Sequence, residues 1–232
     1  MADGCKLPDD RLYNVDMDIW FKMLSSDEYR VGVTQPLCLI TGYFTYVRPR
    51  PERSRVGRGT PIALLVSSKY EGALIAPAEL TILNHNPLVL ENPRKVCEDP
   101  YDSGWICDVI TNGSLLEAGL RNASEAEKLY AEKTRRHGVV CLKDVPDYSM
   151  RVFAETCTTI LTEIGDFMNE HLMAGELLHV VTKDPASEVD IIGWASETGH
   201  ELVDMRREGA ILHVLLRKRV AARPSTTQKV RM

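Results

Sequence analysis

Closely spaced turn residues are the feature of this sequence that most restricts its fold. Between residues 12 and 110, short apolar runs are separated by glycine, proline and Asp/Ser clusters. The clearest runs are 29–34, 43–47 and 61–66. Runs of strand length between frequent turn signals are typical of a β-sandwich or barrel. We therefore expect the first half of the chain to be a β-rich domain.

Length and charge limit the class of protein. A chain of 232 residues fits two domains of roughly 100 residues each. The net charge of −5 argues against nucleic acid as the main partner. No apolar run approaches the roughly 18 residues of a membrane-spanning helix, and the polar, acidic N-terminus lacks a signal-peptide core. We expect a cytoplasmic protein that contacts neither nucleic acid nor a membrane.

The cysteines give no motif of their own. The six lie at positions 5, 38, 97, 107, 141 and 157, and no two have the C-x-x-C spacing of a zinc or redox site. In a cytoplasmic chain the expectation is reduced, mostly buried thiols. His179 and His213 fall on predicted strands without metal-ligand spacing, so packing roles are expected for them and no metal site is predicted.

The chain changes character at Ser114. Two S-x-x-E patterns, which begin at Ser114 and Ser124, are typical of helix N-termini. The second predicts a helix to about Arg136 that turns Leu129 and Tyr130 toward a core, and Gly138 suits the residue after the helix. We place the boundary there, with domains 1–137 and 138–219.

The second half alternates between strand and helix patterns. The expected elements are a strand at 139–143, a helix at 149–171, a strand at 176–182, a helix at 187–198 and a hairpin of 201–206 with 210–217. This βαβαββ order predicts two helices on one face of a four-stranded sheet. The fold class is therefore α+β with two domains. A basic tail at 220–232 follows, expected to be solvated and frayed, with docking to an acidic partner as the alternative.

The first half, about residues 12–133, resembles the glycine cleavage system H-protein family of single-domain lipoyl carriers. The residues that carry the resemblance are Ile19-Trp20-Phe21-Lys22, Arg30-Val31-Gly32-Val33-Thr34, Ser67-Ser68-Lys69, Ala76-Pro77, Asn84, Asp99-Pro100-Tyr101-Asp102-Ser103-Gly104-Trp105 and Tyr130. The resemblance implies a hammerhead or barrel-sandwich lipoyl domain with a C-terminal helix. It also implies that the chain is a carrier without catalytic residues.

In that family a lysine in a tight hairpin turn carries lipoate, and Lys69 occupies this position. Apolar runs enter and leave the turn, and Gly72 is expected to relieve it. The surroundings depart from the family pattern: Val66 replaces an acidic residue, Tyr70-Glu71-Gly72 replaces smaller residues, and the turn after Pro77 is shorter. These departures weaken the expectation that the partners are those of glycine cleavage.

The second half, about residues 139–218, resembles the TusA/SirA-like sulfur carriers. The residues that carry this resemblance are Thr182-Lys183-Asp184-Pro185-Ala186-Ser187, Asp190-Ile191, Trp194, Gly199-His200-Glu201-Leu202, Gly209 and Leu215-Leu216-Arg217-Lys218. In this family a C-P-x-P motif opens the first helix and its cysteine carries a persulfide. We match Val145-Pro146-Asp147-Tyr148 to that motif, with Cys141 in a strand and Cys157 in mid-helix. The domain is therefore expected to lack the motif cysteine and to hold no persulfide.

Together the two resemblances imply a lipoyl carrier with lipoate on Lys69 that shuttles a group or electrons in sulfur metabolism. The alternatives are the aminomethyl carrier of glycine cleavage and an interaction module without carrier chemistry. The implied partners are a lipoate ligase or lipoyltransferase and dihydrolipoamide dehydrogenase. To these the resemblance adds heterodisulfide-reductase-like enzymes or, in the alternative, glycine decarboxylase and aminomethyltransferase.

Overall fold

The structure is a computed structural model that describes residues 5, 7–111, 113–153, 156–183 and 187–219. Its internal contacts divide the chain into two compact units, Met1–Val145 and Pro146–Met232. The first unit thus continues past the boundary expected at 137. The predicted basic tail at 220–232 lies outside the described residues.

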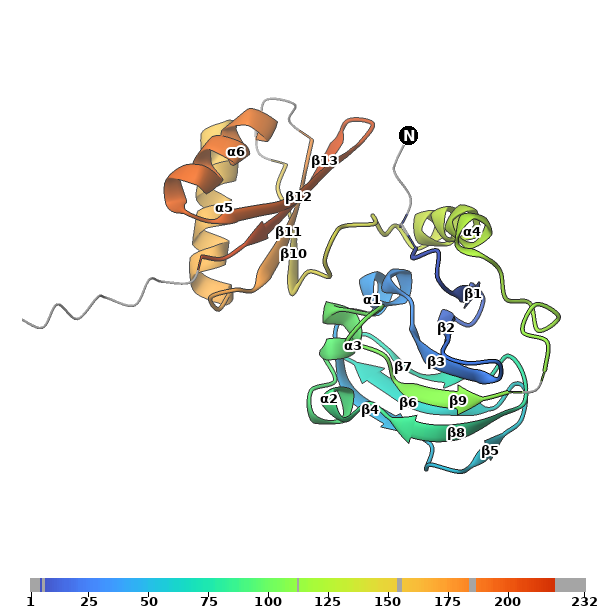
Figure 1. Cartoon of the computed structure of the whole chain (residues 1–232). Helices are drawn as coiled ribbons and strands as arrows, with labels where there is room; N and C mark the ends of the chain where they lie inside the picture. Colours follow the sequence, from blue (N-terminus) through green and yellow to red (C-terminus); the bar gives the residue numbers. More distant parts are fainter. Residues whose placement is uncertain (1–4, 6, 112, 154–155, 184–186, 220–232) are drawn as a thin grey trace, which may run out of the picture. The chain divides into compact units, whose positions relative to one another are not determined.

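The first unit is β-rich, as predicted, and consists of two antiparallel sheets with short helices (Figure 1). Its elements are β1 Leu12–Asn14, β2 Ile19–Met23, β3 Glu28–Val33, α1 Gln35–Thr41, β4 Phe44–Pro49, β5 Arg55–Val56, β6 Pro61–Ser67, β7 Glu71–Ile75, β8 Leu80–His85, α2 Pro87–Glu91, α3 Lys95–Glu98, β9 Cys107–Ile110 and α4 Ala123–Arg136. The six-stranded sheet has the order β1-β2-β3-β9-β8-β5, and the three-stranded sheet has the order β4-β6-β7. Strand alternation sends one set of apolar side chains from each sheet into a shared core.

Trp20 shows how the alternation builds a second cluster. Its neighbours on β2, Ile19 and Phe21, enter the main core, whereas Trp20 packs with the residues beneath α4. The indole Nε1 donates to the carbonyl oxygens of Val33 at 2.8 Å and Pro100 at 3.0 Å. Trp20 lies opposite Gly32 on β3, and a Cβ at that glycine would lie within 3.0 Å of the ring. The glycine therefore leaves the space that the indole occupies.

Helix α4 forms where the second S-x-x-E pattern predicts it, but its cap differs. The side chain of Asn122, not that of Ser124, accepts the backbone N–H of Glu125 at 2.9 Å. Asparagine is as good an N-cap as serine, and it precedes the helix by one residue. The earlier pattern at Ser114 closes a turn, and no helix begins there.

The packing of α4 confirms one predicted anchor and corrects the other. Tyr130 is fully buried and its hydroxyl lies 3.0 Å from that of Thr34. Leu129 is 46% exposed, so the expectation that it faces the core is wrong. Neighbouring helical positions diverge by about 100° around the axis, and a narrow contact admits only one of them. Gly138 takes a φ of +62°, as expected after a helix end.

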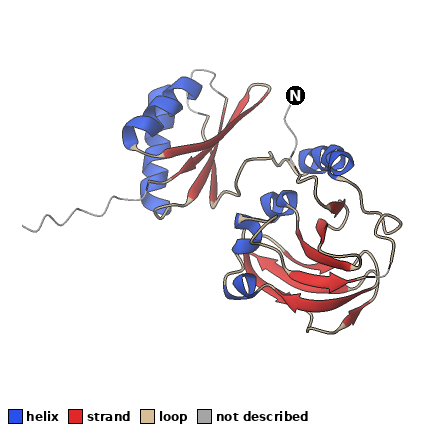
Figure 2. Cartoon of the chain, in the orientation of Figure 1, coloured by secondary structure: helices blue, strands red, loops and turns tan. Residues whose placement is uncertain are grey.

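The second unit has the predicted βαβαββ order. Its elements are β10 Tyr148–Arg151, α5 Cys157–His171, β11 Leu177–Thr182, α6 Ser187–Thr198, β12 Glu201–Glu208 and β13 Ile211–Arg217. The sheet order is β10-β11-β13-β12, in which β10 and β11 run parallel. Figure 2 shows both helices on one face of this sheet. The α+β fold class is confirmed.

The strand expected at 139–143 is absent, and β10 takes its place as the first strand of the second unit. Residues 139–145 instead run along the first unit as irregular chain. The side-chain amide of Gln35 donates to the carbonyl oxygens of Leu142 and Lys143, and the hydroxyl of Tyr43 donates to that of Val145 at 2.6 Å. Side chains of the first unit thus satisfy carbonyl groups that a strand would have paired with a neighbour.

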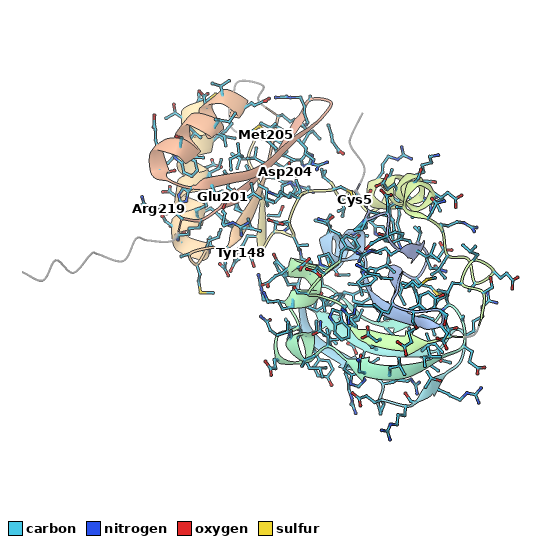
Figure 3. All side chains as sticks on the ribbon, in the orientation of Figure 1. Cys5, Tyr148, Glu201, Asp204, Met205 and Arg219 are labelled. Carbon is cyan, nitrogen blue, oxygen red and sulfur yellow. A yellow bond between two sulfur atoms is a disulfide. The ribbon has the colours of Figure 1, made fainter. Side chains whose placement is uncertain are left out.

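The side chains of β12 separate the two faces of the second sheet. Met205 packs into the apolar cluster beneath the helices. Glu201 and Asp204 point away from that cluster and pair with Arg217 at 2.9 Å and Arg206 at 3.0 Å (Figure 3). The face opposite the helices is therefore polar along β12. None of the described helices in either unit is long and apolar enough to span a membrane.

The expectation of reduced thiols is wrong for four of the six cysteines. Cys38 on α1 and Cys97 on α3 form one disulfide, and Cys5 and Cys141 form another. The paired cysteines are 59 and 136 positions apart, so no local spacing reveals them. The fold brings their Cα atoms to 5.4 and 5.0 Å, which is bridging distance. Cys107 is a buried thiol, as expected.

Candidate functional site

Lys69 lies at the tip of the β6–β7 hairpin. The backbone N–H of Ser67 donates to the carbonyl oxygen of Tyr70 at 2.7 Å, which leaves Ser68 and Lys69 as the two central turn residues. Both central residues are exposed. The hairpin therefore presents the lysine side chain to solvent on a short, hydrogen-bonded turn, as the sequence predicts.

Ser67 ties this turn to a neighbouring helix. Its hydroxyl donates to the carbonyl oxygen of Thr41, the last residue of α1, at 2.7 Å. The same hydroxyl accepts the backbone N–H of Lys69 at 3.2 Å. Ser67 itself is only 9% exposed. A buried hydroxyl therefore connects the lysine backbone to α1.

Tyr70 anchors the other side of the turn. Its ring contacts the edge of Phe44 with centroids 6.3 Å apart, and partial burial raises the pKa of its hydroxyl. A Cβ on Gly72 would lie within 3.0 Å of the Tyr70 hydroxyl. Gly72 belongs to β7, opposite Leu65, so its expected role in relieving the turn is wrong. The glycine therefore leaves room for the tyrosine ring.

The outer face of the three-stranded sheet near Lys69 carries partly exposed apolar side chains, Tyr46 on β4 and Leu64 on β6. Tyr46 and Leu64 are each 46% exposed. Val66, which stands where the family pattern has an acidic residue, pairs across the sheet with Tyr46 and with Glu71. An acidic group is therefore present one strand away from the expected position.

Comparison with known proteins decides the family of this hairpin domain. The family model described as glycine cleavage H-protein matches residues 11–134. The chain belongs to the H-protein family. Members of this family are carrier proteins that bear covalently attached lipoate, and their partner enzymes include glycine decarboxylase, aminomethyltransferase, lipoate ligase and dihydrolipoamide dehydrogenase.

Individual H-proteins are similar over this domain. Glycine cleavage system H protein 3 of Aquifex aeolicus is 29% identical over 147 residues, which cover 61% of this chain and 91% of the relative. Probable glycine cleavage system H protein 2 of Sulfurisphaera tokodaii is 30% identical, over 57% of this chain and 97% of the relative. The crystal structure of the H protein from Mycobacterium marinum covers 57% of this chain and all of that protein, at 25% identity and a TM-score of 0.47.

The second unit matches a different family model. The model described as sulfurtransferase TusA covers residues 168–218, from the end of α5 through β13. The predicted TusA-like domain is therefore confirmed. The match does not reach the start of α5, where this family has its cysteine motif.

The structure places a cysteine at that helix start. Val145, expected at the motif position, is 1% exposed and packs in the core of the first unit. Helix α5 begins at Cys157, and the preceding Thr156 caps it by accepting the backbone N–H of Thr159. The expectation that Cys157 lies in mid-helix is wrong. Thr158 follows where the C-P-x-P motif has proline.

A sequence signal for this helix start was available. Thr156 is a good N-cap residue, and it precedes apolar residues at Ile160, Ile164 and Met168. These three residues are the buried face of α5. Val145-Pro146, the pair matched to the motif, precedes β10 and does not lie at the start of α5. The other candidate, Cys141, is bonded to Cys5 and has no thiol.

The two predicted strand histidines contact each other in the second unit. Nε2 of His179 lies 3.0 Å from Nδ1 of His213, and Nδ1 of His179 lies 3.3 Å from the Ser149 hydroxyl. Burial, together with the charges of His213 and Arg151, lowers the pKa of His179 to about 4. Among the described residues, no group of three or more His, Cys, Asp or Glu side chains is arranged to hold a metal ion. The pair is therefore a neutral hydrogen-bonded contact at pH 7.

Proposed function

We propose that this protein is a lipoyl carrier with lipoate in amide linkage to Nζ of Lys69. The observation that supports this most is the exposed position of Lys69 at the tip of a turn whose backbone is bonded to Tyr70 and Ser67. In the attachment step the C–N bond forms at an activated lipoyl carboxyl group, whose leaving group departs. Nζ changes from an ammonium to an amide and loses two protons overall. Bound lipoate supplies a dithiolane that thiol exchange opens and re-forms.

The hairpin supplies position and tether. The anchored turn keeps the attachment point fixed, and the long lysine side chain provides the moving arm. A short tether of this kind raises the local concentration of the carried group at a docked partner to about millimolar. The apolar outer face with Tyr46 and Leu64 would be covered by that partner. In this role the first unit contributes binding and presentation of the lipoyl arm.

The experiment for Lys69 is mass spectrometry after incubation with lipoate ligase, lipoate and ATP. We expect one lipoyl adduct on the peptide that contains Lys69. Lys69→Arg should abolish the adduct, because its guanidinium does not form the amide. Lys128→Arg is a matched control, since Lys128 is an exposed lysine of α4. An adduct on another lysine, or a wild-type protein that stays unmodified, would contradict the proposal.

The pathway is proposed to be sulfur metabolism, supported by the fusion to a TusA-like domain and by Val66 and Tyr70 beside the lysine. Its partners would then be heterodisulfide-reductase-like enzymes. Aminomethyl transfer in glycine cleavage is the alternative. Docking depends on a few central residues and their charges, so the altered turn should weaken recognition by glycine decarboxylase.

A paired assay separates these pathways. Lipoylated protein should be reduced by dihydrolipoamide dehydrogenase, which needs only an accessible dithiolane. The same protein should support little glycine–bicarbonate exchange with glycine decarboxylase. Exchange at the rate of an H-protein from a glycine cleavage system would favour the alternative.

In contrast to the expectation that this domain holds no persulfide, the position of Cys157 supports a second proposed function, sulfur transfer by the TusA-like domain. A helix N-terminus stabilises a thiolate, and Cys157 is the first residue of α5. The thiolate would attack the outer sulfur of a donor persulfide, so that one S–S bond forms on Cys157, another breaks, and the donor leaves as a thiol. Incubation with a cysteine desulfurase and cysteine should add one sulfur to wild-type protein and none to Cys157→Ser. Equal labelling of both proteins would exclude this function.

A further inference from the structure

The hydroxyl of Ser67 links the backbone of Lys69 to helix α1 through hydrogen bonds. Its two hydrogen bonds, to the carbonyl oxygen of Thr41 and from the N–H of Lys69, have lengths of 2.7 and 3.2 Å. Lys69 lies beyond Val66 and Glu71, the last pair of the β6–β7 ladder. The ladder therefore leaves the Lys69 N–H to another acceptor, and the Ser67 hydroxyl serves as that acceptor.

The acceptor at the other end of this bridge is held firmly. Thr41 is 2% exposed and its own hydroxyl donates to the carbonyl oxygen of Leu37 at 2.9 Å. Three positions before Thr41, Cys38 joins α1 to α3 through its disulfide with Cys97. The carbonyl group of Thr41, which accepts the hydrogen bond from the Ser67 hydroxyl, thus belongs to a pair of helices joined by a disulfide. A bond to a fixed acceptor restricts the turn more than a bond within the turn would.

We propose that Ser67 is a positioning residue for acylation of Lys69, an inference that rests on the proposed lipoyl function. The hydroxyl holds the Lys69 backbone in the one conformation that the modifying enzyme binds. Without it, the Lys69 N–H is left to solvent and the turn samples other conformations. The apparent affinity of the enzyme for the turn is then reduced in proportion to the fraction of molecules that hold this binding-competent conformation. The chemistry at Nζ is unchanged, because Ser67 contacts the backbone of the lysine and not its amine.

This argument predicts a particular kinetic signature. Loss of one hydrogen bond of ordinary net strength corresponds to roughly a fivefold change in an equilibrium. Ser67→Ala should therefore raise KM for the carrier, by at most about fivefold, and leave kcat nearly unchanged. Ser67→Thr retains the hydroxyl on a residue that strands favour, and should restore KM toward the wild-type value.

The test uses the full chain with both disulfides formed, a lipoate ligase, lipoate and ATP. Initial rates of lipoyl-Lys69 formation are measured by mass spectrometry at a series of carrier concentrations for wild type, Ser67→Ala and Ser67→Thr. Ser68→Ala is the matched control, since it removes a hydroxyl from the exposed neighbour in the same turn. Equal KM values for wild type and Ser67→Ala would overturn the inference. A wild-type chain that is not modified would instead contradict the lipoyl function itself.

A second measurement is independent of the variants. Amide hydrogen exchange in the unmodified wild-type chain should show the Lys69 N–H protected relative to that of Ser68. Exchange of the Lys69 amide at the rate of an unprotected peptide would overturn the inference, even if Ser67→Ala proved too unstable to assay.

Discussion

Cys5 and Cys141 are joined by a disulfide across 136 positions of sequence, with their Cα atoms 5.0 Å apart. The bond ties the N-terminal segment to the irregular chain that follows α4. Because Cys141 lies in residues 139–145, this bond adds a covalent link to the hydrogen bonds that Gln35 and Tyr43 donate to that segment. Residues 139–145 are therefore held to the rest of the first unit.

Limited trypsin digestion tests this link. Arg135 and Arg136 lie at the exposed end of α4, so we expect early cleavage there. The two fragments should remain joined on a non-reducing gel, because one contains Cys5 and the other Cys141. They should separate after reduction, or without reduction in Cys5→Ser. Cys157→Ser is the control that leaves both disulfides intact, and fragments that separate under oxidising conditions in wild type would contradict the bond.

The two cysteines outside the disulfides should react differently. Burial strongly raises the pKa of the Cys107 thiol, whereas Cys157 is partly exposed at the start of α5. Thiolates are the reactive species, so iodoacetamide should alkylate Cys157 in the native, oxidised protein. Cys107 should be alkylated only after unfolding. Peptide mass spectrometry over a time course gives both rates, and comparable native rates would contradict the assigned environments.

Gly72→Ala should displace Tyr70 from its place beside the turn. The new Cβ would lie within 3.0 Å of the tyrosine hydroxyl, so the ring must move from Phe44. Overpacking of this kind costs about 1–3 kcal/mol of unfolding free energy. Hydrogen exchange of the β6–β7 peptides in urea measures the loss.

A matched glycine and a double variant control for this test. Gly57→Ala adds a Cβ with no atom within 4 Å, and should leave the same exchange rates unchanged. Tyr70→Ala combined with Gly72→Ala should lose little beyond Tyr70→Ala alone, because the clash is already gone. If the losses caused by the two single substitutions were fully additive, the side chain at position 72 would not contact Tyr70.

Stability of the second unit should fall in mild acid. The pKa of His179 is lowered from 6.5 to about 4, so the folded unit prefers the neutral ring. The contribution of His179 to the stability of the folded unit is complete above pH 6.5 and is lost as the pH falls toward 4. A pKa shift of this size corresponds to a loss of at most about 3 kcal/mol of unfolding free energy. Hydrogen exchange of the β11 and β13 peptides at pH 7 and pH 5, corrected for intrinsic rates, measures this loss.

The variant His179→Gln should show a smaller loss between these pH values, because glutamine does not titrate. His171→Gln, at an exposed position of α5, should behave like wild type. An NMR titration that places the pKa of His179 near 6.5 would contradict the buried pair.

The sequence by itself determined the features that depend on neighbours along the chain. The resemblance carried by short motifs such as Ser67-Ser68-Lys69 implied a hairpin turn at Lys69, and the S-x-x-E pattern at Ser124 located the helix that closes the first unit. The strand and helix periods of the second unit produced its order in the same way. These patterns are local, because strand alternation, turn geometry and helix caps involve residues only a few positions apart.

Only the tertiary structure decided the features that join distant positions. The partners of Cys5 and Cys38 lie 136 and 59 positions away, and no spacing rule relates them. The role of Gly72 depends on where the Tyr70 ring packs, and that depends on Phe44 on another strand. Val145 packs in the core of the first unit and therefore does not open α5, a placement that depends on residues distant in the sequence. In each case the deciding contact forms only after the chain has folded back on itself, so the residue type alone does not reveal it.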